Sequence, residues 1–110
     1  MNDSEVQPYY AVIFTSERSP AEPDEYAAMA ERMVEQARQQ PGFLGINCAR
    51  GSDGVGITVS YWRDLESIKA WKNVAEHQAA QQLGREKWYR NFEVRICRVE
   101  NEYSFDSPIV

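Results

Sequence analysis

The sequence contains one histidine, two cysteines and no long apolar run, and each scarcity excludes a class of protein. Cys48 and Cys97 form no C-x-x-C pair, and His77 with scattered carboxylates matches no metal-ligand spacing. No stretch approaches the roughly 20 apolar residues that a membrane-spanning helix needs. Neither a G-x-G-x-x-G motif nor a P-loop is present, so nothing in the sequence indicates a nucleotide cofactor. We therefore expect a protein without metal, cofactor or membrane insertion.

Acidic residues outnumber basic ones, with 17 Asp and Glu against 12 Lys and Arg. The formal net charge is −5, and acidic residues are spread from Asp3 to Asp106. A surface that binds nucleic acid needs concentrated basic charge to neutralise phosphates, so we expect no nucleic-acid partner. The first residues, MNDSEVQP, lack the basic end and apolar run of a signal peptide. We therefore expect a cytoplasmic protein with reduced thiols.

The chain does contain enough apolar sequence for one compact domain. Its 110 residues are 43% hydrophobic and 26% charged, a mixture typical of globular rather than disordered proteins. A domain of this size buries roughly two-thirds of its unfolded surface, so it needs no disulfide or metal to stay folded. We predict a single domain over residues 1–110, with a core from about 8 to 105 and loose termini.

The first patterned segment, YYAVIFTSE at residues 9–17, is rich in aromatic and β-branched residues and predicts a strand. Because side chains alternate along a strand, both of its faces are apolar. One face carries Tyr9, Ala11 and Ile13, and the other carries Tyr10, Val12 and Phe14. Start and stop signals near Ser19 and Pro41 then enclose a helix of about 16 residues with one apolar stripe.

The second half of the chain repeats the alternation of strands and helices. Residues 43–50 and 55–62 flank the turn GSDG, which predicts an antiparallel hairpin. Asp64 can cap a second helix, which we expect to be bent or split near Asn73, where its apolar stripe loses phase. Residues 91–105 predict one long final strand. Both cysteines fall in strand patterns, where we expect buried structural thiols.

This order of elements predicts an α+β, ferredoxin-like fold, with the two helices on one face of a four-stranded antiparallel sheet. Two helices can cover only one face of such a sheet, yet the first and last strands are apolar on both faces. A large exposed apolar face marks an interaction surface. The simplest cover is a second copy of the chain, so we predict a homodimer through the open sheet face.

Three segments resemble the antibiotic biosynthesis monooxygenase domain family: QQPGFLG, ITVSYWRDLESIKAWKNVAEHQAAQQLGREKWY and VRICRVENEYSF. The resemblance implies a dimeric α+β barrel in which each subunit has a pocket between sheet and helices. Members of the family include cofactor-free monooxygenases of polycyclic phenols or quinols, a quinol monooxygenase and haem-degrading enzymes. A fold shared by several chemistries does not name the reaction, so the pocket residues must decide it.

Haem degradation is the less favoured of these activities. Haem-degrading members carry an Asn on the first strand and a Trp and a His, more widely spaced, on the second helical region. This sequence has no Asn in its first strand, and Trp71 and His77 are only six residues apart. The favoured hypothesis is a cofactor-independent monooxygenase that oxidises a small phenol- or quinol-type aromatic with O₂. The alternative is a non-catalytic dimeric module for small-molecule binding or stress response.

His77 is the first candidate for a catalytic base, because only histidine has an unperturbed pKa near neutral. Trp71 could form the wall of a pocket for a flat aromatic ligand, although Trp62, Trp71 and Trp88 all suit core or interface packing. The polar groups Asn73, Arg85 and Asn47 could orient a substrate oxygen. The competing interpretation places His77 at a pocket edge or on the surface, and the polar residues at helix ends or on the strand surface.

Overall fold

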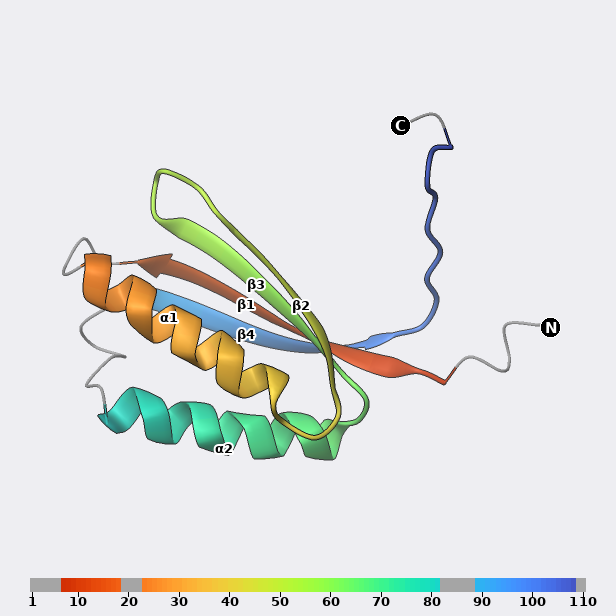
Figure 1. Cartoon of the computed structure of the whole chain (residues 1–110), viewed down its shortest axis with the longest axis horizontal. Coiled ribbons are helices and arrows are strands. Elements are labelled where there is room, and N and C mark those ends of the chain that lie inside the picture. Colours follow the sequence, from red (N-terminus) through yellow and green to blue (C-terminus); the bar gives the residue numbers. More distant parts are fainter. Residues whose placement is uncertain (1–6, 19–22, 82–88, 109–110) are drawn as a thin grey trace.

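A computed structural model describes residues 7–18, 23–81 and 89–108 of the chain. The elements in order are β1 (Tyr9–Arg18), α1 (Pro23–Arg38), β2 (Phe43–Arg50), β3 (Val55–Trp62), α2 (Leu65–Gln81) and β4 (Tyr89–Val99). The strands form one antiparallel sheet in the order β2-β3-β1-β4, and both helices lie on the same face of it (Figure 1). The predicted ferredoxin-like fold is confirmed.

The register of β1 sets the two faces of the sheet. Tyr10 lies opposite Trp62 of β3 and Arg98 of β4, and both pairings are antiparallel. Because side chains alternate along a strand, Tyr10 and Val12 point toward the helices and Tyr9 points to the open face. Tyr10 and Val12 do pack against the core. The predicted two-faced apolar strand is therefore present.

The core of the domain is centred on Trp62, which is completely buried. Ala37 of α1 and Ile68 of α2 form a cluster with it, and Trp71 and Phe43 pack against that cluster. The Trp71 ring stacks on the Trp62 ring at 6.1 Å, and Phe43 meets it edge-on at 5.4 Å. The indole N–H of Trp62 donates to the hydroxyl oxygen of Ser60 at 2.8 Å. The core thus has a buried polar group that is hydrogen-bonded, as buried polar groups must be.

A tight corner joins α1 to β2 and abuts the start of α2. Gly42 has φ 82°, a conformation that side chains strain, and its carbonyl accepts a hydrogen bond from the N–H of Arg63 at 2.8 Å. The N–H of Ser67 donates to a carboxylate oxygen of Asp64 at 2.8 Å, so Asp64 caps α2 as predicted. Hydrogen bonds from Ser67 hold the pKa of Asp64 below its ordinary value.

Replacing Gly42 with alanine should lower the free energy of unfolding by about 2 kcal/mol or more. The left-handed conformation costs a side chain roughly 1–2 kcal/mol. A Cβ at this position would also overlap the side chain of Ser67, which is 9% exposed and cannot swing into solvent. Urea denaturation measures the effect. Gly45→Ala on β2 is the control, because its Cβ would meet only Tyr61 at an ordinary 3.8 Å; equal losses in both variants would contradict the prediction.

The second helix differs from its prediction. It runs without interruption from Leu65 to Gln81, so the expected bend or split near Asn73 is wrong. Val74 and Ala75 are half-buried and follow Trp71 at three and four residues, which keeps the buried stripe in phase. Asn73 itself is exposed on the other side of the helix.

The last strand is shorter than predicted, because β4 ends at Val99 rather than reaching Phe105. Val99 pairs with Tyr9, the first residue of β1, so no strand partner remains beyond it. The expectation of buried thiols is also wrong, since Cys48 and Cys97 are both exposed. They lie on β2 and β4, the two edge strands, where fewer neighbours cover a side chain.

Candidate functional site

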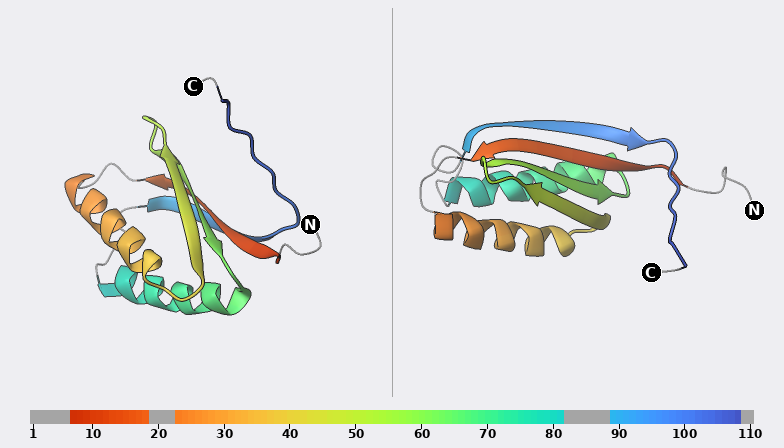
Figure 2. Two further views of the ribbon diagram at one scale, coloured as in Figure 1. Left: turned by 45° about the vertical axis from the view of Figure 1, so that its right-hand side comes forward. Right: turned by 90° about the horizontal axis from the view of Figure 1, so that it is seen from above.

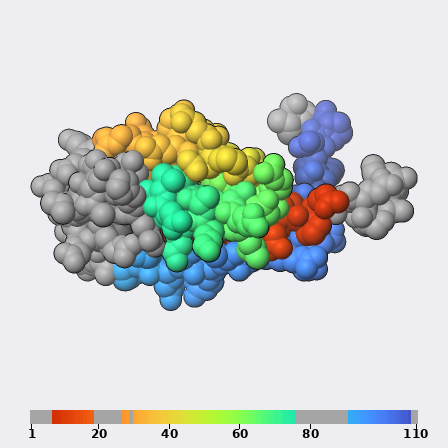
Figure 3. Space-filling view, turned by 90° about the horizontal axis from the view of Figure 1, so that it is seen from below, coloured from red at the N-terminus to blue at the C-terminus, as the bar shows by residue number. Residues whose placement is uncertain are grey.

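The two helices do not cover the whole of the sheet face on which they lie. Val12 of β1 packs against the core, but Ile96, its partner in register on β4, is 51% exposed. Val94 is 50% exposed, and beside it the rings of Phe14 and Phe92 stack at 5.3 Å. We call Phe14, Phe92, Val94 and Ile96 the β4 strip. In Figure 3, which views the helices from below, side chains of β4 emerge alongside α2.

The β4 strip provides flat apolar surface next to the helix that carries the sequence candidates. The strip consists of two stacked phenyl rings and two branched side chains. A flat ligand could make apolar contacts with them but no hydrogen bonds. Sites for small aromatic molecules are mostly apolar with a few placed polar groups. Any polar contact to such a ligand would therefore come from residues outside the strip.

The predicted site residues fall into three groups. Trp71 is half-buried and stacks on Trp62, which confirms the packing interpretation for both tryptophans. Asn73 is exposed, and residues two apart on a helix do not face each other, so the structure does not bring its amide to Trp71. His77 lies in α2, one turn after Asn73, but its side chain lies outside the described residues. Arg85 also lies outside them, as does Trp88.

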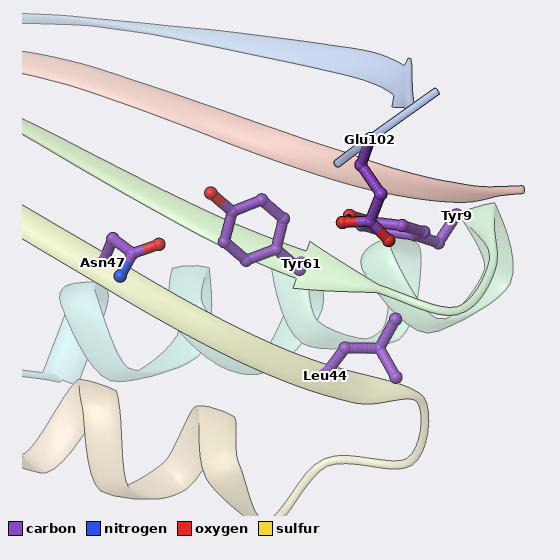
Figure 4. Close-up of a pocket in the computed structure, with 5 residues that line it drawn as sticks. All are labelled: Tyr9, Leu44, Asn47, Tyr61 and Glu102. Atoms are coloured by element: carbon purple, nitrogen blue, oxygen red, sulfur yellow. Dashed lines mark hydrogen bonds between the residues drawn. The ribbon is translucent and has the colours of Figure 1, made fainter. Parts of the chain in front are cut away.

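A second feature is a hollow on the open face of the sheet, of about 420 Å³, shown in Figure 4. Its lining residues are Tyr9, Leu44, Asn47, Tyr61 and Glu102. The structure thus places Asn47 in the hollow. The strands β1, β2 and β3 supply four of these side chains, and Glu102 comes from the segment after β4. We call this feature the open-face hollow.

Two polar side chains of the open-face hollow, Tyr9 and Glu102, are hydrogen-bonded to each other. The hydroxyl of Tyr9 donates to a carboxylate oxygen of Glu102 at 2.7 Å, and this bond raises the pKa of Tyr9 above its ordinary value. The Tyr61 ring meets the Tyr9 ring edge-on at 6.2 Å. A neutral phenol held as a donor is a binding group rather than a base at neutral pH. The hollow therefore suits binding better than proton transfer.

The sequence did not indicate that Tyr9, Tyr61 and Glu102 line the open-face hollow. The hairpin and the alternation of β1 place Tyr9 and Tyr61 on one face once the register is known. Glu102 has no such local signal, because its position depends on how the chain leaves β4. Among residues 7–18, 23–81 and 89–108, no group of three His, Cys, Asp or Glu side chains could hold a metal ion. No helix in the same ranges is long and apolar enough to cross a membrane.

Comparison with known proteins places the chain in a family. Residues 9–83 match the family model for antibiotic biosynthesis monooxygenases. The uncharacterized protein YqjZ of Bacillus subtilis is 48% identical over 98 residues, which cover 89% of this chain and 85% of YqjZ. The jasmonate monooxygenase ABM of Pyricularia oryzae is 27% identical over 92 residues, which cover 82% of this chain but only 43% of that protein.

Solved structures share the fold of this chain. SnoaB, a cofactor-independent oxygenase from Streptomyces nogalater, has a solved structure similar to this one with a TM-score of 0.67, covering 88% of this chain and 97% of that one. At 14% identity this similarity concerns the fold alone. The family match covers more than half of the chain and agrees with the sheet and helices described above. The chain therefore belongs to the antibiotic biosynthesis monooxygenase family.

Proposed function

We propose that the protein is a cofactor-independent monooxygenase that oxidises a small phenol- or quinol-type aromatic with O₂. The observation that carries the proposal is the β4 strip, an apolar surface with two stacked rings beside α2, the helix that contains Trp71 and His77. Family membership supports the reaction class. The relatives named a jasmonate monooxygenase and a cofactor-independent oxygenase support it further.

In the proposed reaction, His77 removes the proton of the substrate hydroxyl group. The electron-rich phenolate then reacts with O₂ at a ring carbon. One oxygen atom stays on that carbon as a carbonyl, and the other leaves as water with the two hydrogens of the phenol O–H and ring C–H. The substrate itself supplies the electrons, so the balance needs no external reductant. The protein contributes a base, an orientation and a site that excludes water.

The remaining candidates have supporting roles in this proposal. Trp71 lies against the Trp62 ring and offers the edge of a flat wall. Arg85 is the polar group that we assign to hold the substrate oxygen, because Asn73 is exposed on the side of α2 away from Trp71. The experiment is an oxygen-electrode assay with hydroxylated polycyclic substrates and no added cofactor. Stoichiometric O₂ uptake with formation of a quinone supports the proposal, and substrate binding without O₂ uptake contradicts it.

The second candidate function is a binding module without turnover. The observation in its favour is the open-face hollow, whose lining includes two tyrosines, an amide and a carboxylate but no histidine. A ligand bound there would be held, not deprotonated. Binding that is lost in Tyr61→Ala but kept in His77→Ala would favour this second function over the oxygenase. Degradation of haem is not proposed, since the residues of the haem-degrading pattern are incomplete in this sequence.

A homodimer through the open sheet face belongs to the same proposal. Leu44, Val55 and Ile57 are 55%, 42% and 46% exposed, which is unusual for large apolar side chains on a sheet. A two-fold axis would cover this face with the same face of a second copy. We expect light scattering to give the mass of a dimer at micromolar concentration, with an interface of roughly 800 Å² or more per partner. A monomer under these conditions would contradict the dimer.

A further inference from the structure

One row of residues crosses all four strands on the helix face of the sheet. Arg50 of β2 lies opposite Gly56 of β3, and Gly56 lies opposite Ser16 of β1. Ser16 in turn lies opposite Phe92, the first residue of the β4 strip. Ser16 follows Val12 by four residues, so the alternation of side chains puts the row on the face that carries the helices. The row therefore leads from a charged residue at one edge of the sheet to the apolar β4 strip at the other.

The guanidinium of Arg50 reaches across β3 to β1. It donates to the hydroxyl oxygen of Ser16 at 3.1 Å and to the carbonyl oxygen of Gly54. Glycine at position 56 makes this path possible, because a Cβ there would lie 2.5–2.9 Å from Cζ, Nη2 and Nε of Arg50. Ser16 is only 2% exposed, so the acceptor is fixed within the packed sheet. The cation is therefore held over the middle of the sheet and not at its edge.

The position of this guanidinium makes it a neighbour of the β4 strip. Ser16 is two residues from Phe14 on β1 and lies opposite Phe92, and adjacent strands are about 4.8 Å apart. The Phe14 and Phe92 rings stack at 5.3 Å, and Val94 beside them is 50% exposed. In the right-hand view of Figure 2, β4 is the strand farthest from α1. A cation beside an exposed apolar surface suits a ligand with a flat apolar body and an anionic end.

We propose that Arg50 binds the carboxylate of an aromatic acid whose rings lie on the β4 strip. The inference rests on the proposed function and deepens it, because it names the substrate class of that site. The planar fork of a guanidinium matches a carboxylate with two parallel hydrogen bonds. Its five N–H donors allow it to bind a carboxylate while the bonds to Ser16 and Gly54 persist. One guanidinium also balances the single charge of a carboxylate, whereas a phosphate ester brings more charge.

The attraction must be local to Arg50. The chain has a formal net charge of −5, so its overall field repels an acid. An aromatic acid that binds more tightly than its neutral counterpart must therefore contact a specific cation. The β4 strip contacts both ligands equally, because its side chains are apolar. The difference in affinity between the two ligands is thus a measure of Arg50 alone.

The first test compares two fluorescent probes in full-length protein, a hydroxynaphthoate and the neutral hydroxynaphthalene-methanol of the same substitution pattern. We expect the wild type to bind the naphthoate about tenfold or more tightly, the scale of a hydrogen bond to a charged group. Arg50→Gln should lose this preference and keep its affinity for the neutral probe. Arg95→Gln is the matched control, because it removes the same charge from the open face of β4, opposite Ile13. Equal affinities of the wild type for both probes would overturn the proposal.

The second test moves the charge without removing it. In Gly56→Ala the new methyl group takes the place of the guanidinium, and the long side chain of Arg50 can swing aside. We expect the preference for the naphthoate to fall to that of Arg50→Gln, while the urea midpoint and the affinity for the neutral probe stay the same. A preference that survives in both variants overturns the proposal. An equal loss of both probes would make Arg50 a structural clamp and overturn it as well.

Oxygen uptake separates this inference from the proposed function. If the wild type prefers the naphthoate through Arg50 but consumes no O₂ with it, the oxygenase is wrong and the carboxylate site stands. If the wild type and Arg50→Gln oxidise both probes with equal kcat/KM, the carboxylate site is wrong and the oxygenase stands.

Discussion

Replacing Trp62 with alanine should lower the free energy of unfolding by about 3–5 kcal/mol, the range for deleting a large aromatic side chain from a core. Trp62 has no exposed surface, and it contacts both helices through Ala37 and Ile68. Removing its ring also removes the stacking partner of Trp71. Because whole domains are stable by only about 5–15 kcal/mol, this single change should remove a large share of the stability. Chemical denaturation followed by far-UV circular dichroism measures it.

Two matched variants separate packing from hydrogen bonding at this position. Trp62→Phe keeps an aromatic ring and should lose clearly less than the alanine variant. Ser60→Ala keeps the indole but removes its acceptor at 2.8 Å, and an unsatisfied buried donor costs about 1–3 kcal/mol. Leu65→Ala on α2, where the side chain is 52% exposed, should change little. If Trp62→Ala proved no worse than Leu65→Ala, the assigned core would be wrong.

The second large effect concerns activity, and it depends on the proposed oxygenase function. His77→Ala should lower turnover of a hydroxylated polycyclic substrate by roughly 10²-fold or more, the usual scale for a lost general base. A base must be deprotonated to act, so the wild-type rate should fall as the pH is lowered and the imidazole is protonated. The variant should lose this inflection in the pH profile. Steady-state kinetics across pH provide both measurements.

The control for this prediction lies on the same helix. Lys69→Ala changes an exposed side chain two turns before His77 and should keep both the rate and the pH profile. The dimer mass and the denaturation midpoint should stay the same in His77→Ala, which excludes a loss caused by misfolding. Full activity in His77→Ala would remove the base assignment. Trp71 together with Asn73 and Arg85 would then become the candidates.

The local elements were predictable because their signals are local. The hairpin bounds at residues 43–50 and 55–62 agree with the structure, since alternation on both sides of GSDG leaves little choice of register. The cap at Asp64 follows from residue type and position alone. The end of β4 was not predictable in this way. The alternating pattern continues through Tyr103 and Phe105, but the strand stops where its neighbour β1 begins.

The candidate site was harder to predict than the fold. Trp71 could be placed toward the core from helical spacing, and the structure confirms that contact. The β4 strip is exposed because α1 makes its main sheet contacts with β2 and α2 with β3, at the other edge of the sheet from β4. The open-face hollow depends on Glu102, which reaches Tyr9 from 93 residues away in sequence. Neither the β4 strip nor the open-face hollow could be predicted from the pattern of a short stretch of sequence.

The central position of β1 has a consequence for the order of folding during synthesis. β1 is made first, yet its two neighbours in the sheet are β3 and β4, and its first residue pairs with Val99. Until β4 has emerged from the ribosome, one edge of β1 stays unpaired and its apolar side chains lack half of their neighbours. Domains whose contacts join distant parts of the chain fold slowly. Until they fold, their unpaired strand edges are prone to aggregation. The sheet can therefore be completed only after almost all of the chain has been translated.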